Sequence, residues 1–422
     1  MSNIAPLFDA IIRHIPEPKA DEESPLQMMV VSISYDHYQG RIAVGRVHRG
    51  TLKNNMQVAH IRSTGEVKKY KITGLTTFMG LSRVPIESLR AGDIAAVSGI
   101  PDVNIGDTIA DGEHPDPLLP IDVEKPTVKM MFSVNDSPFS GQEGLYCTSR
   151  NLRERLFREL DNDVALRVEE TSLADEFSVS GRGELHLSIL IEKMRREGYE
   201  LQVSRPEVIF KTENGKTLEP SEDVWIEAPE EYSGMVIRKM GMRKGELKNM
   251  NAENGIARFH FFITTRGLIG FRSEFMLETK GTGVINALFA GYIPKREDIE
   301  TNSHGSLVAH EEGVSTAYAL LKAQERGEMF VGPGEKIYEG QVVGQNAREQ
   351  DIVVNVCKTK HLNNFRTKAE AVTNDLIPPR ILSLEQALEY IGNDELMEVT
   401  PKSIRLRKNI LRNILRKKAD VF

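Results

Sequence analysis

A short basic segment, residues 358–368, has the composition of an RNA contact. It contains no carboxylate and four cations: Lys358, Lys360, Arg366 and Lys368. Uncharged polar and aromatic residues are interleaved with these cations: His361, Asn363, Asn364 and Phe365. Cations neutralise phosphates, amides bond base edges or sugars, and an aromatic ring stacks on a base. A solvated surface loop would have the same composition. The residues alone leave the two interpretations equally open.

Arginines beside glycine turns form a second candidate site. Arg266 and Arg272 bracket the start of a predicted helix, and Arg182 lies in a similar turn earlier in the chain. A helix N-terminus beside an arginine is a good phosphate site. Each arginine could instead fix its turn to a neighbouring carboxylate, and this structural explanation accounts for any one of them at least as well.

Nucleotide motifs are not found in the sequence. Residues 214–217 contain the Gly-Lys-Thr of a phosphate loop, but the glycine that the motif requires five residues before Gly215 is replaced by Phe210. Asn214 and Gly215 instead predict a hairpin turn. No Asn-Lys-x-Asp motif for reading guanine occurs. We therefore expect this chain neither to bind nor to hydrolyse GTP.

Metal and acid–base motifs are also not found. His310 and Glu311 begin a His-Glu-x-x-His pattern, but the last position is Val314. His186 and His260 lie inside predicted elements and are interpreted as structural residues, because no second ligand is in helical register with either one. The sequence therefore predicts no catalytic, cofactor-binding or metal-binding residue.

Composition restricts the class of protein. A chain of 422 residues is too long for one core, so three or four domains are expected. There is no apolar run of about 18 residues and no secretion signal, which predicts a cytoplasmic protein without a membrane partner. The two cysteines are too few for a disulfide framework. The net charge of -7 excludes a uniformly basic DNA or RNA binder but allows local basic patches.

The predicted elements place the candidate arginines in two copies of one supersecondary pattern. Residues 127–203 and 224–289 each read strand, helix, strand, strand, helix, strand, which predicts two ferredoxin-like βαββαβ domains. In each copy an Arg-Gly pair precedes an amphipathic helix, over residues 184–194 and 268–277. Gly183 and Gly267 are therefore expected to occupy the same position, where a positive φ or close packing would require glycine.

The remaining sequence predicts mostly β structure. Short, evenly spaced strands between residues 26 and 111 predict a small β-barrel. Glycine-punctuated strands follow residue 296, and Ser383 with Gln386 forms a capping box for one helix. Residues 316–324 could form a helix or a strand, and residues 402–418 carry eight basic side chains and no acidic one.

The fold class is therefore multi-domain β and α+β: a small β-barrel, two ferredoxin-like domains and a mainly β C-terminal domain with a capped helix. The predicted boundaries are 1–22 (remnant of a preceding domain and linker), 23–116 (barrel), 121–205 and 206–295 (ferredoxin-like domains), and 296–422 (C-terminal domain).

Several longer runs resemble the BipA/TypA family of ribosome-associated translational GTPases, which is related to elongation factor G. Residues 40–50 and 91–94 resemble the second-domain barrel of translational GTPases. The runs that resemble BipA/TypA itself are residues 162–171, 179–187, 266–275, 393–401 and 404–408. The resemblance covers essentially the whole chain, and several runs are long enough to be specific.

The chain also departs from the family. The family begins with a GTPase domain, and its nucleotide motifs are not found here, while residues 5–12 resemble the last helix of that domain. The tip domain that elongation factor G inserts between its two ferredoxin-like domains is also missing. The chain thus resembles the C-terminal portion of the family, and GTP and magnesium are expected in the missing domain, with no cofactor in this chain.

The resemblance implies binding at the factor site of the ribosome and a role in large-subunit assembly or in translation under stress. It also implies that the C-terminal domain, with residues 358–368, reaches towards tRNA or ribosomal RNA. Two other classes stay open: a protein-interaction scaffold without RNA binding, and a metabolic enzyme with a pocket between the ferredoxin-like domains. The sequence predicts no particular oligomeric state.

Overall fold

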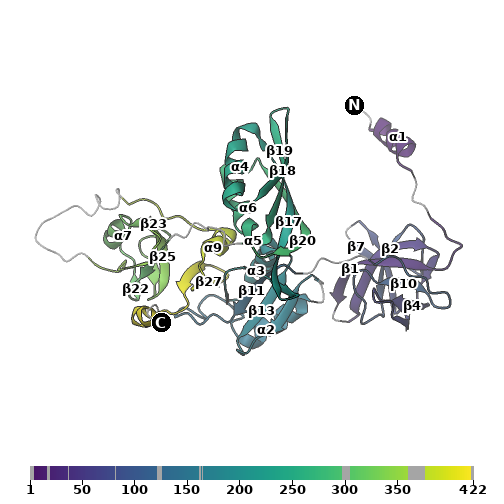
Figure 1. Ribbon diagram of the computed structural model, residues 1–422. Helices are drawn as coiled ribbons and strands as arrows, with labels where there is room; N and C mark the ends of the chain where they lie inside the picture. The colour runs from purple at the N-terminus through teal and green to yellow at the C-terminus, as the bar shows by residue number, and fades with distance from the viewer. Residues whose placement is uncertain are drawn as a thin grey trace, which may run out of the picture. The chain divides into compact units, whose positions relative to one another are not determined.

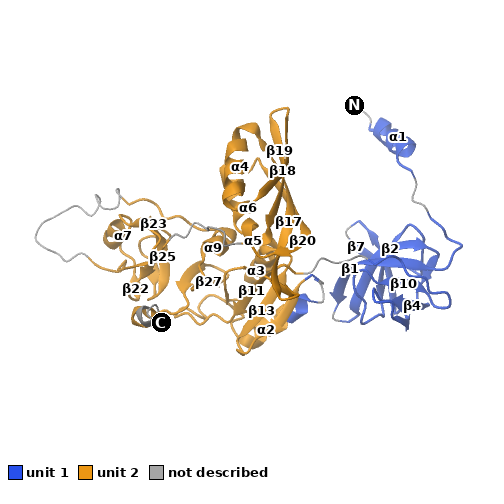
Figure 2. Ribbon diagram, in the orientation of Figure 1, with its two compact units in different colours: residues 1–124, 157–165 blue, residues 125–156, 166–422 orange. Residues whose placement is uncertain are grey.

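The computed structural model describes residues 4–16, 20–36, 38–80, 82–120, 126–160, 163, 165–296, 305–359 and 376–419. The chain divides into two compact units, residues 1–124 with 157–165 and residues 125–156 with 166–422 (Figure 2). The five predicted domain boundaries are finer than this division and stay predictions. None of the described helices is long and apolar enough to span a membrane.

Unit 1 is mostly β structure, as predicted. Helix α1 (Ala5–His14) has no buried residue. The strands form an antiparallel eight-stranded sheet in the order β5-β4-β10-β1-β2-β9-β6-β7, with β3 and β8 paired separately. A core made mainly of valine, leucine, isoleucine and methionine side chains holds them together, and Ala59, Ile61 and Ala110 form a second, smaller cluster. The strands are β1 (Gln27–Asp36), β2 (Gly40–Arg49), β3 (Thr51–Lys53), β4 (Gln57–Ile61), β5 (Val67–Lys71), β6 (Gly74–Met79), β7 (Ser82–Pro85), β8 (Ser88–Arg90), β9 (Ile94–Ser98) and β10 (Thr108–Asp111).

The first part of unit 2 has the predicted ferredoxin-like topology. Its sheet order is β12-β13-β11-β14, so the first and third strands are central neighbours. One face of helix α3 is buried, including Leu187, Ile191 and Met194, as its helical spacing predicts. The elements are β11 (Val128–Ser133), α2 (Ser149–Glu159), β12 (Arg167–Glu170), β13 (Glu176–Gly181), α3 (Glu184–Arg196) and β14 (Leu201–Val203).

The second ferredoxin-like domain repeats this order as β18-β19-β17-β20. Helices α4 and α6 pack on one face of its sheet (Figure 1), and their buried side chains join one core with those of the strands. The Asn214-Gly215 hairpin turn is confirmed, since both residues have positive φ, 52° and 75°. The elements are β15 (Glu207–Val208, paired with β11), β16 (Lys211–Glu213), β17 (Lys216–Pro229), η1 (Glu230–Tyr232), α4 (Ser233–Met242), β18 (Glu246–Glu253), β19 (Ile256–Thr264), α5 (Thr265–Leu268), α6 (Phe271–Glu278) and β20 (Val284–Pro294).

Two predictions about the Arg-Gly turns are wrong. The helix predicted over residues 268–277 is two helices, α5 and α6, separated at Gly270, whose φ of 78° is left-handed. Gly267 lies inside α5, whereas Gly183 precedes α3, so the two glycines do not occupy the same position. Gly183 has an extended φ of 175° and no atom near the site of a Cβ, so neither reason predicted for glycine applies there.

The C-terminal part of unit 2 is mainly β. Residues 317–323 form a helix, which decides the open choice for that segment, and the capping box of Ser383 and Gln386 is confirmed. Strand β27 pairs with β14, so one sheet continues from the first ferredoxin-like domain into this region. The elements are β21 (Ser306–Ala309), β22 (Gly313–Val314), α7 (Ala317–Ala323), β23 (Gly327–Met329), β24 (Lys336–Ile337), β25 (Gln341–Asn346), β26 (Ile352–Val354), α9 (Leu384–Tyr390), β27 (Glu395–Val399), β28 (Ile404–Lys408) and α10 (Asn413–Ala419).

Candidate nucleic-acid interface

Of the predicted contact residues in the basic segment, Lys358 lies among those that the structure describes. The carbonyl oxygen of Lys358 accepts a hydrogen bond from the Thr316 hydroxyl at 2.7 Å. Thr316 is the N-cap of α7, and its backbone N–H donates to the carbonyl of Val356 at 3.0 Å. The other predicted contact residues lie outside the described residues: Lys360, His361, Asn363, Asn364, Phe365, Arg366 and Lys368.

The chain returns to the opposite end of the same helix. The backbone N–H of Ile377 donates to the side-chain oxygen of Gln324, the C-cap of α7, at 3.3 Å. The N–H of Arg380 then bonds the carbonyl of Met329 at 2.8 Å, and Leu376 packs against the domain core. A seven-residue helix is about 10 Å long. The residues between Lys358 and Ile377 therefore start and finish close together, which is typical of a binding segment held by a rigid scaffold.

Helix α7 also presents a cation and an aromatic ring, which the sequence analysis missed. The Lys322 ammonium lies 4.7 Å from the centroid of the Tyr318 ring. A side-chain hydrogen bond with Tyr318 raises the pKa of Lys322, so its ammonium stays charged at neutral pH. The spacing of four residues would have indicated this pair if the segment had been recognised as a helix.

Arg266 makes a bidentate ion pair with a buried carboxylate. Its Nε lies 3.1 Å and its Nη2 3.3 Å from the two carboxylate oxygens of Glu219, whose side chain is fully buried. Nη2 also donates to the carbonyl of Arg296 at 3.1 Å. This geometry supports the structural explanation for Arg266, because its donors already serve a carboxylate that would otherwise be buried without a counter-charge.

Arg272 and Arg182 are more accessible. Arg272 is exposed on α6, and its Nη1 lies 3.5 Å from the carbonyl of Ile285, a long and weak hydrogen bond. Arg182 is exposed in the turn before α3, where its backbone N–H donates to Nδ1 of His186 at 3.2 Å. Lys358, in contrast, follows β26. The candidate residues therefore lie in three separate domains, and the RNA contacts predicted for Lys358 and Arg272 stay predictions.

The basic residues of the C-terminal strand β28 face the protein interior. Arg407 and Lys408 are only 2% and 3% exposed. Arg407 lies 2.8 Å from a carboxylate oxygen of Asp136, and the Lys408 ammonium lies 2.8 Å from Asp394 and 3.0 Å from Glu395. These cations are therefore unavailable to a polyanion, although the composition of residues 402–418 indicates a basic tail.

A buried glutamate links the first ferredoxin-like domain to the C-terminal region. Glu398 on β27 is fully buried and accepts hydrogen bonds from Asn135, Ser137, Tyr338 and Arg405 at 2.9–3.1 Å. Two of these donors belong to the first ferredoxin-like domain and two to the C-terminal region. Together with the β14–β27 pairing, they fix the scaffold that holds the basic segment.

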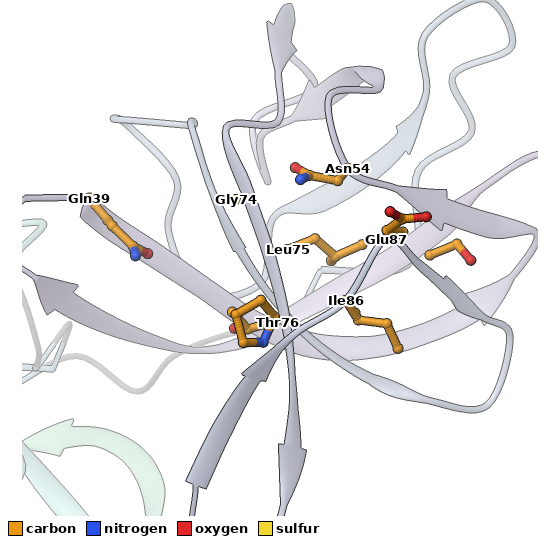
Figure 3. A pocket seen from close by; sticks show the side chains of 9 residues that line it. Gln39, Asn54, Gly74, Leu75, Thr76, Ile86 and Glu87 are labelled. Carbon is orange, nitrogen blue, oxygen red and sulfur yellow. The ribbon is translucent and has the colours of Figure 1, made fainter.

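Unit 1 contains a shallow hollow formed by residues of that unit alone (Figure 3). The polar side chains of Gln39, Asn54 and Glu87 lie around it, with Leu75 and Ile86 at its base. The enzyme hypothesis required a pocket between the ferredoxin-like domains with a perturbed carboxylate or histidine. This hollow lies elsewhere in the chain and does not meet that requirement.

Four family matches cover most of the chain. Residues 40–110 match domain 2 of elongation factor Tu, 148–205 match domain III of elongation factor G, and 216–303 match the elongation factor G C-terminus. These matches define a multi-domain relative of the translation elongation factors. Residues 304–413 match the TypA/BipA C-terminal domain.

Full-length relatives give the same assignment. The chain is 48% identical over 407 residues to "Large ribosomal subunit assembly factor BipA" of Synechocystis, covering 96% of this chain and 68% of that protein. It is also 48% identical over 419 residues to the Bacillus subtilis protein of the same name, covering 99% and 68%. "Putative elongation factor TypA-like SVR3, chloroplastic" of Arabidopsis thaliana is 48% identical over 409 residues, with 96% and 60% covered. The chain belongs to the BipA/TypA family and corresponds to its C-terminal portion.

Proposed function

We propose that this chain is a ribosome-binding module that acts in assembly of the large ribosomal subunit and in translation under stress. Two bacterial relatives at 48% identity are named as large-subunit assembly factors, which supports the first role. The proposed partners are the factor-binding site of the ribosome, its ribosomal RNA and tRNA. The proposed location is the cytoplasm.

One structural observation carries the RNA-binding part of this proposal. The chain is bonded to helix α7 at Lys358, through Thr316, and again at Ile377, through Gln324. These two residues flank the stretch that contains the other three cations. Four cations are thus placed in a chain segment whose ends are fixed to a packed domain. Like charges so close together repel each other, so folding gives no reason to cluster them, whereas a polyanion does.

We also propose that residues 1–422 neither bind nor hydrolyse GTP. Their sequence contains neither a phosphate loop nor an Asn-Lys-x-Asp motif. Calorimetric titration of the purified chain with GTP and magnesium is expected to give no binding heat. Micromolar affinity for GTP would refute this part of the proposal.

The central experiment is sedimentation with purified ribosomes at several salt concentrations. The test variant changes Lys358, Lys360, Arg366 and Lys368 to glutamate. If about four phosphates are neutralised, the segment contributes a slope of roughly -3 to -4 to the plot of log affinity against log salt. The variant should bind much more weakly and with a flatter salt dependence. Phe365→Ala should weaken binding without changing the slope, because stacking does not depend on counterions.

A matched control changes the same amount of charge at four positions that are not clustered. Four exposed cations of unit 2 scattered outside the segment are changed to glutamate: Arg167, Lys216, Arg238 and Lys280. This control should keep most of the salt dependence. If the segment variant sediments like the wild type, the segment does not contact RNA. The protein-interaction scaffold then becomes the better explanation.

A further inference from the structure

The sheet of the second ferredoxin-like domain has one face that its helices leave uncovered. Val224, Phe259 and Phe261 point to the helix side and belong to the core. The alternate residues, including Trp225 and His260, point to the opposite face. Trp225 is 40% exposed, although tryptophan carries the largest apolar side chain.

The two rings on this face stack against each other, so each ring keeps only its outer face for a ligand. Trp225 and His260 are direct cross-strand partners, and their rings stack with centroids 4.8 Å apart and planes inclined by only 4°. The His260 Nε2 lies 2.8 Å from a carboxylate oxygen of Asp223, which fixes the orientation of the imidazole ring. The stacked pair is therefore held in place before any ligand arrives.

Amide side chains continue the same row on both sides. Asn249 on β18 is the cross-strand partner of His260, and Asn286 on β20 is the partner of Trp225. The order across the sheet is amide, imidazole, indole, amide. With strands about 4.8 Å apart, this row spans about 14 Å, enough for two nucleotides with their base edges beside an amide.

Two cations lie beside Phe262, in the row of side chains next to the Trp225 and His260 pair. Phe262 follows His260 on the same face, with the Lys248 ammonium 5.4 Å and the Arg296 guanidinium 5.8 Å from its ring centroid. Lys248 also lies 3.0 Å from Glu246. Arg258, on the other side of His260, lies 3.1 Å from Glu227. The charges of this face are therefore largely paired, so a ligand would gain more from stacking than from phosphate neutralisation.

We propose that this face binds single-stranded RNA by stacking unpaired bases on the outer faces of the Trp225 and His260 rings. The aromatic residues lie on the first and third strands of a βαββαβ sheet. RNA-binding sheets of four strands also stack bases on aromatic side chains. Aromatic rings beside amides suit nucleobases, which have flat faces and polar edges. This site does not depend on the basic segment and extends the proposed function to a second RNA contact.

The test uses a natural reporter, since Trp225 is the only tryptophan in the chain. Single-stranded oligouridine or oligoadenine of about ten nucleotides is added to the full chain, and the tryptophan emission is followed. Saturable quenching is expected. The same quenching is expected in the variant whose four segment cations are changed to glutamate. A duplex of equal length should not quench, because its bases are already stacked. Duplex quenching equal to that of the single strand would overturn the proposal.

Variants measure the stacking contribution through the anisotropy of a labelled oligonucleotide. Trp225→Leu should weaken binding by about five- to 150-fold, the range expected for loss of one stacked base, whereas Trp225→Phe should lose less. Tyr38→Leu removes an almost fully exposed aromatic ring from unit 1 and should bind like the wild type. Melting temperatures of the variants identify any that bind weakly because they unfold.

Two results would refute the site. Trp225→Leu could bind the oligonucleotide as tightly as the wild type, or the tryptophan emission could stay constant while anisotropy reports binding. Either result would leave Trp225 and His260 as a cross-strand pair that only stabilises the sheet. Two measurements on the variant with four segment glutamates separate this site from the basic segment. Ribosome binding of that variant tests the proposed function. Tryptophan quenching of the same variant by the oligonucleotide tests this face alone.

Discussion

The carboxylate of Glu184 accepts a hydrogen bond from the backbone N–H of Gly270 at 3.0 Å. Glu184 is the first residue of α3, and Gly270 immediately precedes α6, so one ferredoxin-like domain caps a helix of the other. Glu389 of α9 lies beside the same glycine: a Cβ on Gly270 would be 2.7 Å from its Cγ. Two carboxylates from different domains therefore share the neighbourhood of one helix N-terminus.

This shared site predicts a pH-dependent stability. Burial raises the pKa of Glu184, and burial with the nearby Glu184 carboxylate raises the pKa of Glu389 to about 7. A raised pKa means that the folded state holds the proton more tightly than the unfolded state does. The protonated carboxyl group therefore adds to the stability of the fold below about pH 4.5, and this contribution is lost as the pH rises through about 7. Glu389→Gln, measured by urea unfolding, should therefore gain stability relative to the wild type between pH 5 and pH 8.

The expected gain is modest because the Glu389 side chain is only partly covered, and the solvent that reaches the rest of it screens its charge. Glu349→Gln, which changes an exposed glutamate in a turn, is the matched control and should show no such gain. Parallel pH profiles for the wild type and Glu389→Gln would contradict the shared-site explanation.

A second prediction compares two glycines. A Cβ on Gly267 would lie 2.9 Å from the Ile263 side chain and 3.0 Å from the Arg243 carbonyl, whereas a Cβ on Gly183 would meet nothing within 4 Å. Gly267→Val should therefore lower the free energy of unfolding by more than about 1 kcal/mol. Gly183→Ala should change it by less than about 0.5 kcal/mol. Thermal unfolding of both variants tests this, and an unchanged melting temperature for Gly267→Val would rule out the close packing.

Local sequence signals predicted much of this fold. Capping by Ser383 and the hairpin turn at Asn214 depend on neighbouring residues only, and both are confirmed. The break at Gly270 was missed because the apolar spacing of Leu268, Phe271 and Phe275 continues across it. Periodicity records which side chains are buried and does not report a left-handed residue between them.

Pairing between strands far apart in the sequence explains the other features of the fold that the sequence did not predict. Strand β14 meets β27 through the register Leu201 to Val399, and neither short strand signals its partner locally. The same region of the fold surrounds Arg405 with Glu143 and Glu398, so the cations of β28 are paired inside the protein, whereas Lys402 and Arg412 stay exposed. The stacked pair of Trp225 and His260 was missed for the same reason, since it requires the register of β17 against β19.

A third prediction concerns Arg266. Its partner Glu219 is fully buried, and without the guanidinium the Arg296 N–H at 2.7 Å would be its one remaining donor among the described residues. Arg266→Ala should therefore cost roughly 3 kcal/mol of unfolding free energy. Adding Glu219→Leu to this variant should recover a large part of the loss, because the uncompensated buried charge is then gone. Urea unfolding of the single and double variants measures both effects. A stable Arg266→Ala protein would mean that the arginine is not structural.

The last prediction separates Arg272 from Arg266. Arg272 is exposed on α6, and its contact with the carbonyl of Ile285 is long at 3.5 Å. Arg272→Gln should therefore change the free energy of unfolding by no more than about 0.5 kcal/mol. If Arg272 contacts a phosphate, the same change should weaken ribosome binding uniformly and reduce the salt slope by about one.

Arg238→Gln provides the matched control for Arg272→Gln, since Arg238 is an exposed arginine on α4 of the same domain. It removes the same charge and should leave the slope unchanged. Sedimentation with ribosomes at several salt concentrations compares the two variants. Equal slopes for Arg272→Gln and the wild type would remove Arg272 from the interface. A lowered melting temperature would instead assign Arg272 the structural role that the geometry gives to Arg266.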